Sequence, residues 1–196
     1  VAEASSRARS AGSMSRRVRF FSVMPVDMRP IGITSSSGDN LDDMPDKMTK
    51  KARKLTRKGW TFRFARTEKD KNKAVELFRT VDGIAGNAVF DGDILVAESP
   101  HHSIAGAALL GSWEDANGLR HCLVRVLAVA PDKQGKGVGT ALLWATHAAA
   151  RGIEVFGGCS AANEGFYRAA GCEIRTDLGN GMVSSNPLYN RWFVLP

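Results

Sequence analysis

The feature that most constrains this chain is a hydrophobic run that ends in a glycine-rich loop, which in turn opens a helix. Residues 121–130 indicate a buried strand, Pro131 ends it, and a loop of sequence QGKGVGT at 134–140 leads into a helical pattern over 138–150. Glycines let the backbone approach a ligand closely, and the first turn of a helix presents unpaired N–H groups at the positive end of its dipole. This order of elements therefore predicts a binding site for a phosphate or diphosphate.

The pattern from residue 60 onward alternates between strand and helix signals. A strand at 60–65 is followed by Thr67 and Asp70 at the spacing of a capping box, which opens a helix. The further expected strands are 94–98, 103–111, 121–130, 153–157, 172–177 and 190–195; the further expected helices are 138–150 and 163–170, and a polar turn is expected at 113–118. This order predicts the α/β class, as a three-layer domain with a mixed sheet flanked by helices.

The net charge of +7 lies in the first third of the chain. Residues 1–60 hold 13 Lys and Arg against 6 Asp and Glu, whereas residues 61–196 hold 14 of each. A folded domain that binds a polyanion carries its positive surplus on its own surface, so nucleic-acid binding is expected only through the N-terminal region. Residues 1–59 show no sustained period and are expected to form a basic, flexible extension before a domain at 60–196.

The extension allows several interpretations. Residues 4–19 hold five arginines among Ser and Ala with no acidic residue, which fits an organelle transit peptide; a regulatory arm and sequence upstream of a start at Met14 are the alternatives. A second basic run at 47–58 has apolar residues at helical spacing, so we expect a short amphipathic helix that lies as a solvated arm against the domain. Those apolar residues are Met44, Met48, Ala52 and Leu55.

Cysteine usage and hydropathy bound the compartment and the cofactors. Cys122, Cys159 and Cys172 have no paired spacing and no nearby histidine ligand, which argues against a disulfide framework and a structural metal. No apolar stretch reaches the roughly 20 residues that a membrane span needs. The sequence thus predicts a cytoplasmic protein without membrane contact, with organelle import as the alternative.

The spacing of the loop distinguishes three kinds of phosphate site. A Walker A loop requires Ser or Thr where Gly137 stands, and the dinucleotide fingerprint requires glycine where Thr140 stands. The pattern Gln134-x-x-Gly137-x-Gly139 instead resembles the Q/R-x-x-G-x-G/A loop of the GNAT acyl-CoA N-acyltransferases, and the resemblance extends over residues 60–195. It implies a central sheet with splayed strands, acetyl-CoA as co-substrate and no metal.

The resemblance also implies which residues hold the cofactor. Leu127, Ala128 and Val129 on the central strand are expected to contact the thioester and pantetheine through their main chain. The loop and the start of its helix are expected to hold the diphosphate. These residues are Gln134, Gly135, Lys136, Gly137, Val138, Gly139 and Thr140.

A second match lies in residues 166–172, which are similar to the family segment that carries a tyrosine four residues before a Gly-Phe pair. Tyr167 falls where the family places its general acid. Cys172 replaces the usual phenylalanine. The asparagine that many members carry seven residues before the tyrosine is Ser160 here, so Asn163 is either a cofactor contact or a helix cap.

The residues give several candidates for the general base. His121 at the start of the central strand and Glu98 at the end of an earlier strand are the two we select, and Glu114 and Asp115 read as solvated turn residues. Arg125 alternates with Leu123 and Leu127, so the three side chains are expected on one face of the strand.

The predicted function is acetyl transfer from acetyl-CoA to a primary amine of a small molecule or peptide by direct attack. The alternatives are a catalytically degenerate acyl-CoA sensor and a nucleic-acid-docking module with a basic arm. The acceptor pocket is expected to be lined by the helix after Thr67 and by segments 81–90 and 179–187. The oligomeric state stays open, with a dimer among the alternatives.

Overall fold

A seven-stranded mixed sheet forms the centre of the computed structural model, which describes residues 46–81, 90–114, 117–176 and 191–195. The strands lie in the order β1-β2-β3-β4-β5-β7-β6, and neighbours are antiparallel except for β4 and β5. Their bounds are β1 (Thr61–Phe64), β2 (Asp93–Glu98), β3 (Ile104–Glu114), β4 (Arg120–Val129), β5 (Val155–Cys159), β6 (Glu173–Arg175) and β7 (Arg191–Leu195). The helices are α1 (Asp46–Thr56), α2 (Glu68–Phe78), α3 (Val138–Ala150), α4 (Glu164–Ala170) and a short 3-10 helix, η1 (Pro131–Lys133).

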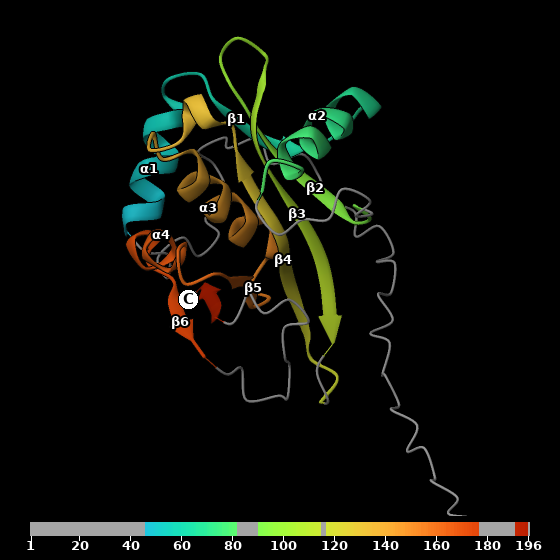
Figure 1. Cartoon of the computed structure of the whole chain (residues 1–196), viewed down its shortest axis with the longest axis vertical. Coiled ribbons are helices and arrows are strands. Elements are labelled where there is room, and N and C mark those ends of the chain that lie inside the picture. The colour runs from blue at the N-terminus through green and yellow to red at the C-terminus, as the bar shows by residue number, and fades with distance from the viewer. Residues whose placement is uncertain (1–45, 82–89, 115–116, 177–190, 196) are drawn as a thin grey trace, which may run out of the picture.

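Helices cover both faces of the sheet, which confirms the predicted three-layer α/β class (Figure 1). On one face α1, α3 and α4 pack over a core that includes the fully buried Leu142 and Phe193. On the other face Ala74 and Phe78 of α2 pack against a smaller apolar cluster. Each strand of the centre therefore has apolar side chains on both sides, as expected for a sheet between two helical layers.

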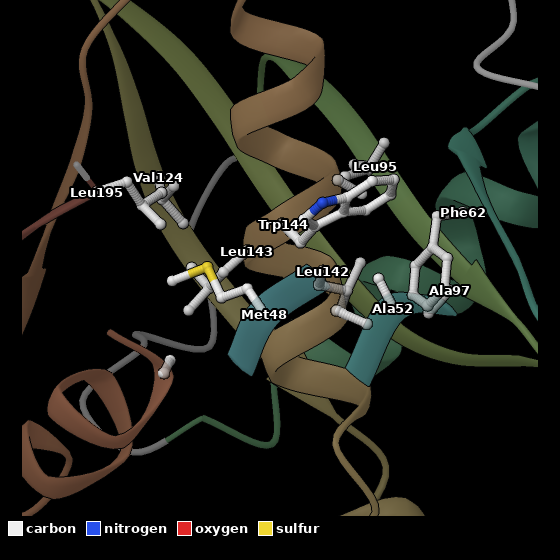
Figure 2. Packing of buried hydrophobic residues seen from close by; sticks show 14 of the residues in the cluster. Met48, Ala52, Phe62, Leu95, Ala97, Val124, Leu142, Leu143, Trp144 and Leu195 are labelled. Carbon is white, nitrogen blue, oxygen red and sulfur yellow. The ribbon is translucent and has the colours of Figure 1, made fainter. Parts of the chain in front are cut away.

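Helix α1 contributes to the core, whereas the sequence predicts a solvated arm for this segment. Met48, Ala52 and Leu55 are only 0%, 1% and 6% exposed, which confirms the amphipathic helix but makes the expectation of a solvated arm wrong. Figure 2 shows Met48 and Ala52 pointing from α1 toward α3. The apolar side of the helix outweighs its basic side because its burial removes apolar surface from water. Residues 1–45 lie outside the described ranges, so the extension itself stays a prediction.

The capping box that opens α2 is present as the sequence predicts. The Thr67 hydroxyl accepts a hydrogen bond from the Asp70 N–H at 3.1 Å, and the Asp70 carboxylate accepts one from the Thr67 N–H at 3.3 Å. Two N–H groups at the helix start are thereby satisfied. The signal is local to four residues, which explains why it could be recognised without tertiary information.

Strands β3 and β4 form a longer hairpin than expected. Residues 113 and 114 belong to β3 and pair with His121 and Arg120, so the predicted polar turn at 113–118 begins too early. The register shifts by one residue at Arg125, because Leu110 pairs with Val124 and Leu109 with Val126. This shift is a β-bulge, which leaves one residue of the strand unpaired and changes the alternation of the side chains.

The bulge corrects the expected orientation of three side chains on β4. Leu127 packs against the α3-side core, whereas Leu123 packs in a separate cluster around Phe156. Arg125 lies over Gly111, since a Cβ on that glycine would meet the Arg125 side chain at 3.2 Å. Leu123, Arg125 and Leu127 therefore do not share one face.

Position 177 of the predicted strand 172–177 and position 190 of the predicted strand 190–195 lie outside the described residues.

In the part of the chain that the structure describes, no helix is both long enough and apolar enough to cross a bilayer.

Candidate functional site

The two parallel strands in the middle of the sheet separate soon after they meet. Strands β4 and β5 pair only at Cys122 with Val155 and at Leu123 with Phe156, although both strands continue beyond these pairs. Gly157 follows the last pair, and a Cβ there would lie 2.6 Å from the carbonyl oxygen of Val124. The sheet therefore consists of two parts, β1-β2-β3-β4 and β5-β7-β6, joined by a short parallel contact.

The main chain of Leu127 and Val129 faces the side from which β5 has diverged. The Ala130 N–H donates to the Ala105 carbonyl of β3 at 2.9 Å, and main-chain groups of successive strand residues point to alternate sides. The N–H and C=O groups of Val129 and Leu127 therefore point away from β3. The Gln134 side-chain amide donates to the Val129 carbonyl at 3.1 Å, which agrees with this direction.

The loop that follows β4 begins with η1 and is held by its own side chains. Gln134 ends η1 and ties the loop back to the end of β4 through Val129. The Lys136 ammonium donates to the Asp132 carbonyl at 2.7 Å, and Lys133 forms an ion pair with the Asp132 carboxylate. Both lysines of the loop thus bind Asp132 before the helix begins.

Two glycines of the loop adopt the left-handed conformation that the turn into α3 requires. Gly135 has φ +69° and Gly137 has φ +88°, values that other residues adopt only with strain. Gly137 is the N-cap of α3 and provides no side-chain cap, and the first turn contains no acidic residue. The first helical hydrogen bond runs from the Ala141 N–H to the Gly137 carbonyl at 3.0 Å.

The start of α3 is consequently suited to an anion. The N–H groups of Val138, Gly139 and Thr140 precede the first helical hydrogen bond and point out of the helix along its axis, where the dipole is positive. A Cβ on Gly135 would meet no atom within 4 Å, so the space beside the loop is open. This arrangement fits a diphosphate, whose oxygens accept several N–H hydrogen bonds at once.

Two of the predicted contact residues offer only their main chain. Ala128 is 3% exposed on the α2 face of the sheet, and Val138 is 1% exposed in the α3-side core. The Thr140 side chain is half-buried in the first turn of α3. The sequence correctly predicts that these positions belong to the strand and to the start of the helix. It does not indicate that only their main-chain atoms can reach a ligand.

A row of rings connects the loop with Tyr167. Gly139 faces the Phe166 ring, because a Cβ on this glycine would lie 3.1 Å from the ring and 3.5 Å from Val129. The rings of Phe166 and Tyr167 are 4.8 Å apart, and Tyr167 stacks on Phe193 of β7 at 4.0 Å. The structure thereby brings the loop, the end of β4 and Tyr167 together on the α3 face.

Phe166 is a site residue that the sequence analysis did not select. It is 36% exposed, although it is a large apolar side chain next to the helix start. Asn163 precedes α4 and makes no side-chain cap hydrogen bond; its carbonyl accepts from the Phe166 N–H at 3.0 Å. The proposed capping role of the Asn163 side chain is therefore wrong, and its role as a cofactor contact stays a prediction.

Glu98 lies in an ion-pair network instead of a reactive position. Its carboxylate accepts from the Arg63 guanidinium at 2.8 Å and lies 3.0 Å from the His102 ring nitrogen. The hydrogen bond with Arg63 holds the pKa of the Glu98 carboxyl below its usual value. A carboxylate with a lowered pKa and two engaged oxygens is a weak base, which argues against the predicted role.

His121 lies at the far end of β4 from the loop. Val129 lies eight positions further along the chain, or about 25 Å of extended strand. The His121 Nδ1 is 3.3 Å from the Glu154 carboxylate, and its ring meets the Phe156 ring edge-on at 5.8 Å. The structure does not bring His121 to the loop, so this candidate for the base is separated from the other predicted site residues. Glu114 ends β3, and Asp115 lies outside the described residues.

The three cysteine thiols are weakly acidic; Cys159 and Cys172 are buried and Cys122 is half-buried. Burial raises the pKa of the Cys122 and Cys172 thiols to about 12 and that of the Cys159 thiol to about 11. Thiolates are the nucleophilic form, so these cysteines are poor nucleophiles near neutral pH. No group of three metal-binding side chains occurs in the described ranges.

Residues 90–173, from the end of the α2 connection to β6, match the family model described as an acetyltransferase (GNAT) domain. This part of the chain is similar to the GNAT acetyltransferase domain. The match includes β4, the glycine loop, α3 and Tyr167, which are the parts that form the site. No curated protein sequence matches the chain.

Solved structures show the same fold at low sequence identity. An aminoglycoside acetyltransferase from an uncultured soil metagenomic sample, in complex with sisomicin, is 17% identical with a TM-score of 0.51, over 64% of this chain and 97% of that one. Glucosamine-6-phosphate N-acetyltransferase from Arabidopsis thaliana is 16% identical with a TM-score of 0.50, over 64% and 97%. Identities this low establish the GNAT fold alone and leave the acceptor open.

Proposed function

We propose that this protein transfers an acetyl group from acetyl-CoA to a primary amine, and that the amine attacks the thioester directly. The observation that carries the proposal is the uncapped start of α3 beside the stretch in which β4 and β5 no longer pair, which we call the gap between β4 and β5. An anion-binding helix start and an opening in the sheet lie at the same end of β4. A cofactor with a diphosphate and an extended thioester arm can use both features at once.

The chain's own main-chain groups would bind and orient this co-substrate. Residues 135–140 would hold the diphosphate through N–H groups, with Lys136 nearby. The N–H groups of Leu127 and Val129 point into the gap and are suitable donors for the thioester oxygen. One donor of this kind contributes about 3 kcal/mol to the stabilisation of a developing oxyanion.

Tyr167 is the proposed proton donor to the leaving thiolate. A tyrosine hydroxyl, with a reference pKa of about 10, keeps its proton near neutral pH and can donate it by general acid catalysis as the thiolate, whose thiol has a reference pKa of about 8.5, departs. The Tyr167 ring stacks on Phe193 and lies beside Phe166, the ring that faces Gly139 of the loop, which supports this role. The weakly acidic cysteines support direct attack over an acyl-enzyme.

The proposed acceptor is a small amine or the amine of a peptide. Two walls of the expected acceptor pocket, residues 82–89 and 179–187, lie outside the described ranges. We therefore propose a panel of aminoglycosides, amino sugar phosphates and short peptides, with thiol release from acetyl-CoA as the readout. Release that depends on the added amine supports the transferase, whereas CoA binding without release supports the sensor.

A matched pair of variants tests the loop. Gly135 and Gly152 both have positive φ, +69° and +83°, and a Cβ on either would meet nothing within 4 Å. Asp tolerates this conformation, so Gly135→Asp and Gly152→Asp should both fold. Because Gly135→Asp places a carboxylate beside the start of α3, it should weaken CoA binding by at least about tenfold in calorimetry. Gly152→Asp should bind CoA normally; equal affinity of the two variants would contradict the loop assignment.

A further inference from the structure

One side chain from outside the matched domain reaches the glycine loop. Lys51 of α1 runs along Gly137, since a Cβ on this glycine would lie 3.0 Å from the Lys51 Cδ and 3.7 Å from its Cγ. The ammonium lies two bonds beyond Cδ, at about 2.5 Å. It therefore stands close to the N-cap of α3. Helix α1 precedes residue 90, where the family match begins.

Lys51 is held at this place by the core packing of its helix. Met48 and Ala52 on the neighbouring turn positions are buried against α3 at 0% and 1% exposure. Lys51 itself is exposed, and its ammonium makes no hydrogen bond or ion pair within the part of the chain that the structure describes. Lys133 and Lys136, the two lysines of the loop, are both engaged with Asp132.

Lys51 and Phe166 flank the start of α3. Gly137, the N-cap, faces Lys51, whereas Gly139 in the first turn faces Phe166. An anion on the free N–H groups of the first turn would therefore lie near both the Lys51 side chain and the Phe166 ring. The ammonium adds a full positive charge to the partial charge of the helix dipole.

We propose that Lys51 binds the diphosphate of coenzyme A, so that α1 completes the cofactor site of the domain. This inference rests on the proposed function, because it requires the diphosphate at the start of α3. It assigns a cofactor-binding role to a helix that precedes the first strand. The buried apolar side of α1 positions the residue, and the basic side supplies the charge.

Calorimetric titration of the full chain with CoA and with dephospho-CoA tests the proposal. Lys51→Gln should weaken binding of both ligands about tenfold, because both carry the diphosphate and a charge-assisted contact is lost. Lys51→Arg should retain most of the affinity. Arg53→Gln removes the same charge from the opposite side of α1 and should bind within twofold of the unmodified chain.

The outcomes separate this inference from the proposed function. If the unmodified chain binds no CoA, the proposed function fails, and the role of Lys51 fails with it. If it binds CoA and Lys51→Gln binds equally well, only the role of Lys51 is refuted. A loss confined to CoA and absent with dephospho-CoA would place the contact at the 3′-phosphate and overturn the diphosphate assignment.

Discussion

Gly157 at the fork between β4 and β5 provides a stability test of the divided sheet. A Cβ at this position would lie 2.6 Å from the Val124 carbonyl oxygen and 2.7 Å from two ring carbons of Phe193. Neither neighbour can move away at low energetic cost. The Val124 oxygen is a main-chain atom of β4, and the Phe193 ring is fully buried. Overpacking of this kind costs 1 to 3 kcal/mol, so we expect Gly157→Ala to lower the free energy of unfolding by about 3 kcal/mol.

Urea unfolding followed by tryptophan fluorescence measures this loss, and thermal unfolding should show a decrease in Tm of about 10 °C. Gly165→Ala in α4 is the matched control, since its Cβ would meet nothing within 4 Å. Replacing a helical glycine should stabilise the control by up to about 1 kcal/mol. An unfolding midpoint of Gly157→Ala within 2 °C of the unmodified chain would refute the close approach of β5 to Val124.

The remaining predictions concern the proton donor and the ion-pair network. Tyr167→Phe keeps the ring stacked on Phe193, so turnover should fall about 100-fold while CoA affinity stays within twofold; unchanged turnover would mean that another group protonates the thiolate. Arg63→Met should destabilise the fold by about 2 kcal/mol at pH 7, because it removes the guanidinium that lowers the pKa values of the Asp70 and Glu98 carboxyls. The stabilisation that a lowered carboxyl pKa provides is complete above the ordinary pKa of about 4 and is lost progressively as the pH falls from there through the lowered folded-state pKa. The difference in urea midpoint should therefore be constant above about pH 5 and decrease below about pH 4; a difference that stays constant down to about pH 2 would contradict the network.

Local signals in the sequence predicted the elements that form the site. The bounds of α3, the capping box of α2 and the glycine loop all depend on residues a few positions apart, so each could be recognised from spacing alone. The order of strands and helices then sufficed for the α/β class. The role of Gly139 was anticipated as close approach to a ligand, whereas the structure places the Phe166 ring against it.

Features that depend on distant contacts could not be predicted in this way. The bulge at Arg125 reverses the alternation of β4 without a characteristic residue. Glu98 pairs with Arg63 across 35 positions, so nothing near it in sequence distinguishes an ion-pair partner from a base. The many basic residues of α1 led us to predict a solvated arm in spite of its apolar spacing. The surface of α3 that buries Met48 can be seen only in the folded structure.

A crystal structure of the chain with bound acetyl-CoA tests the central claim most directly. We predict the diphosphate within hydrogen-bonding distance of the main-chain N–H groups of residues 137–140, and the thioester in the gap between β4 and β5. Density for the cofactor elsewhere on the molecule, with the start of α3 vacant, would contradict the account.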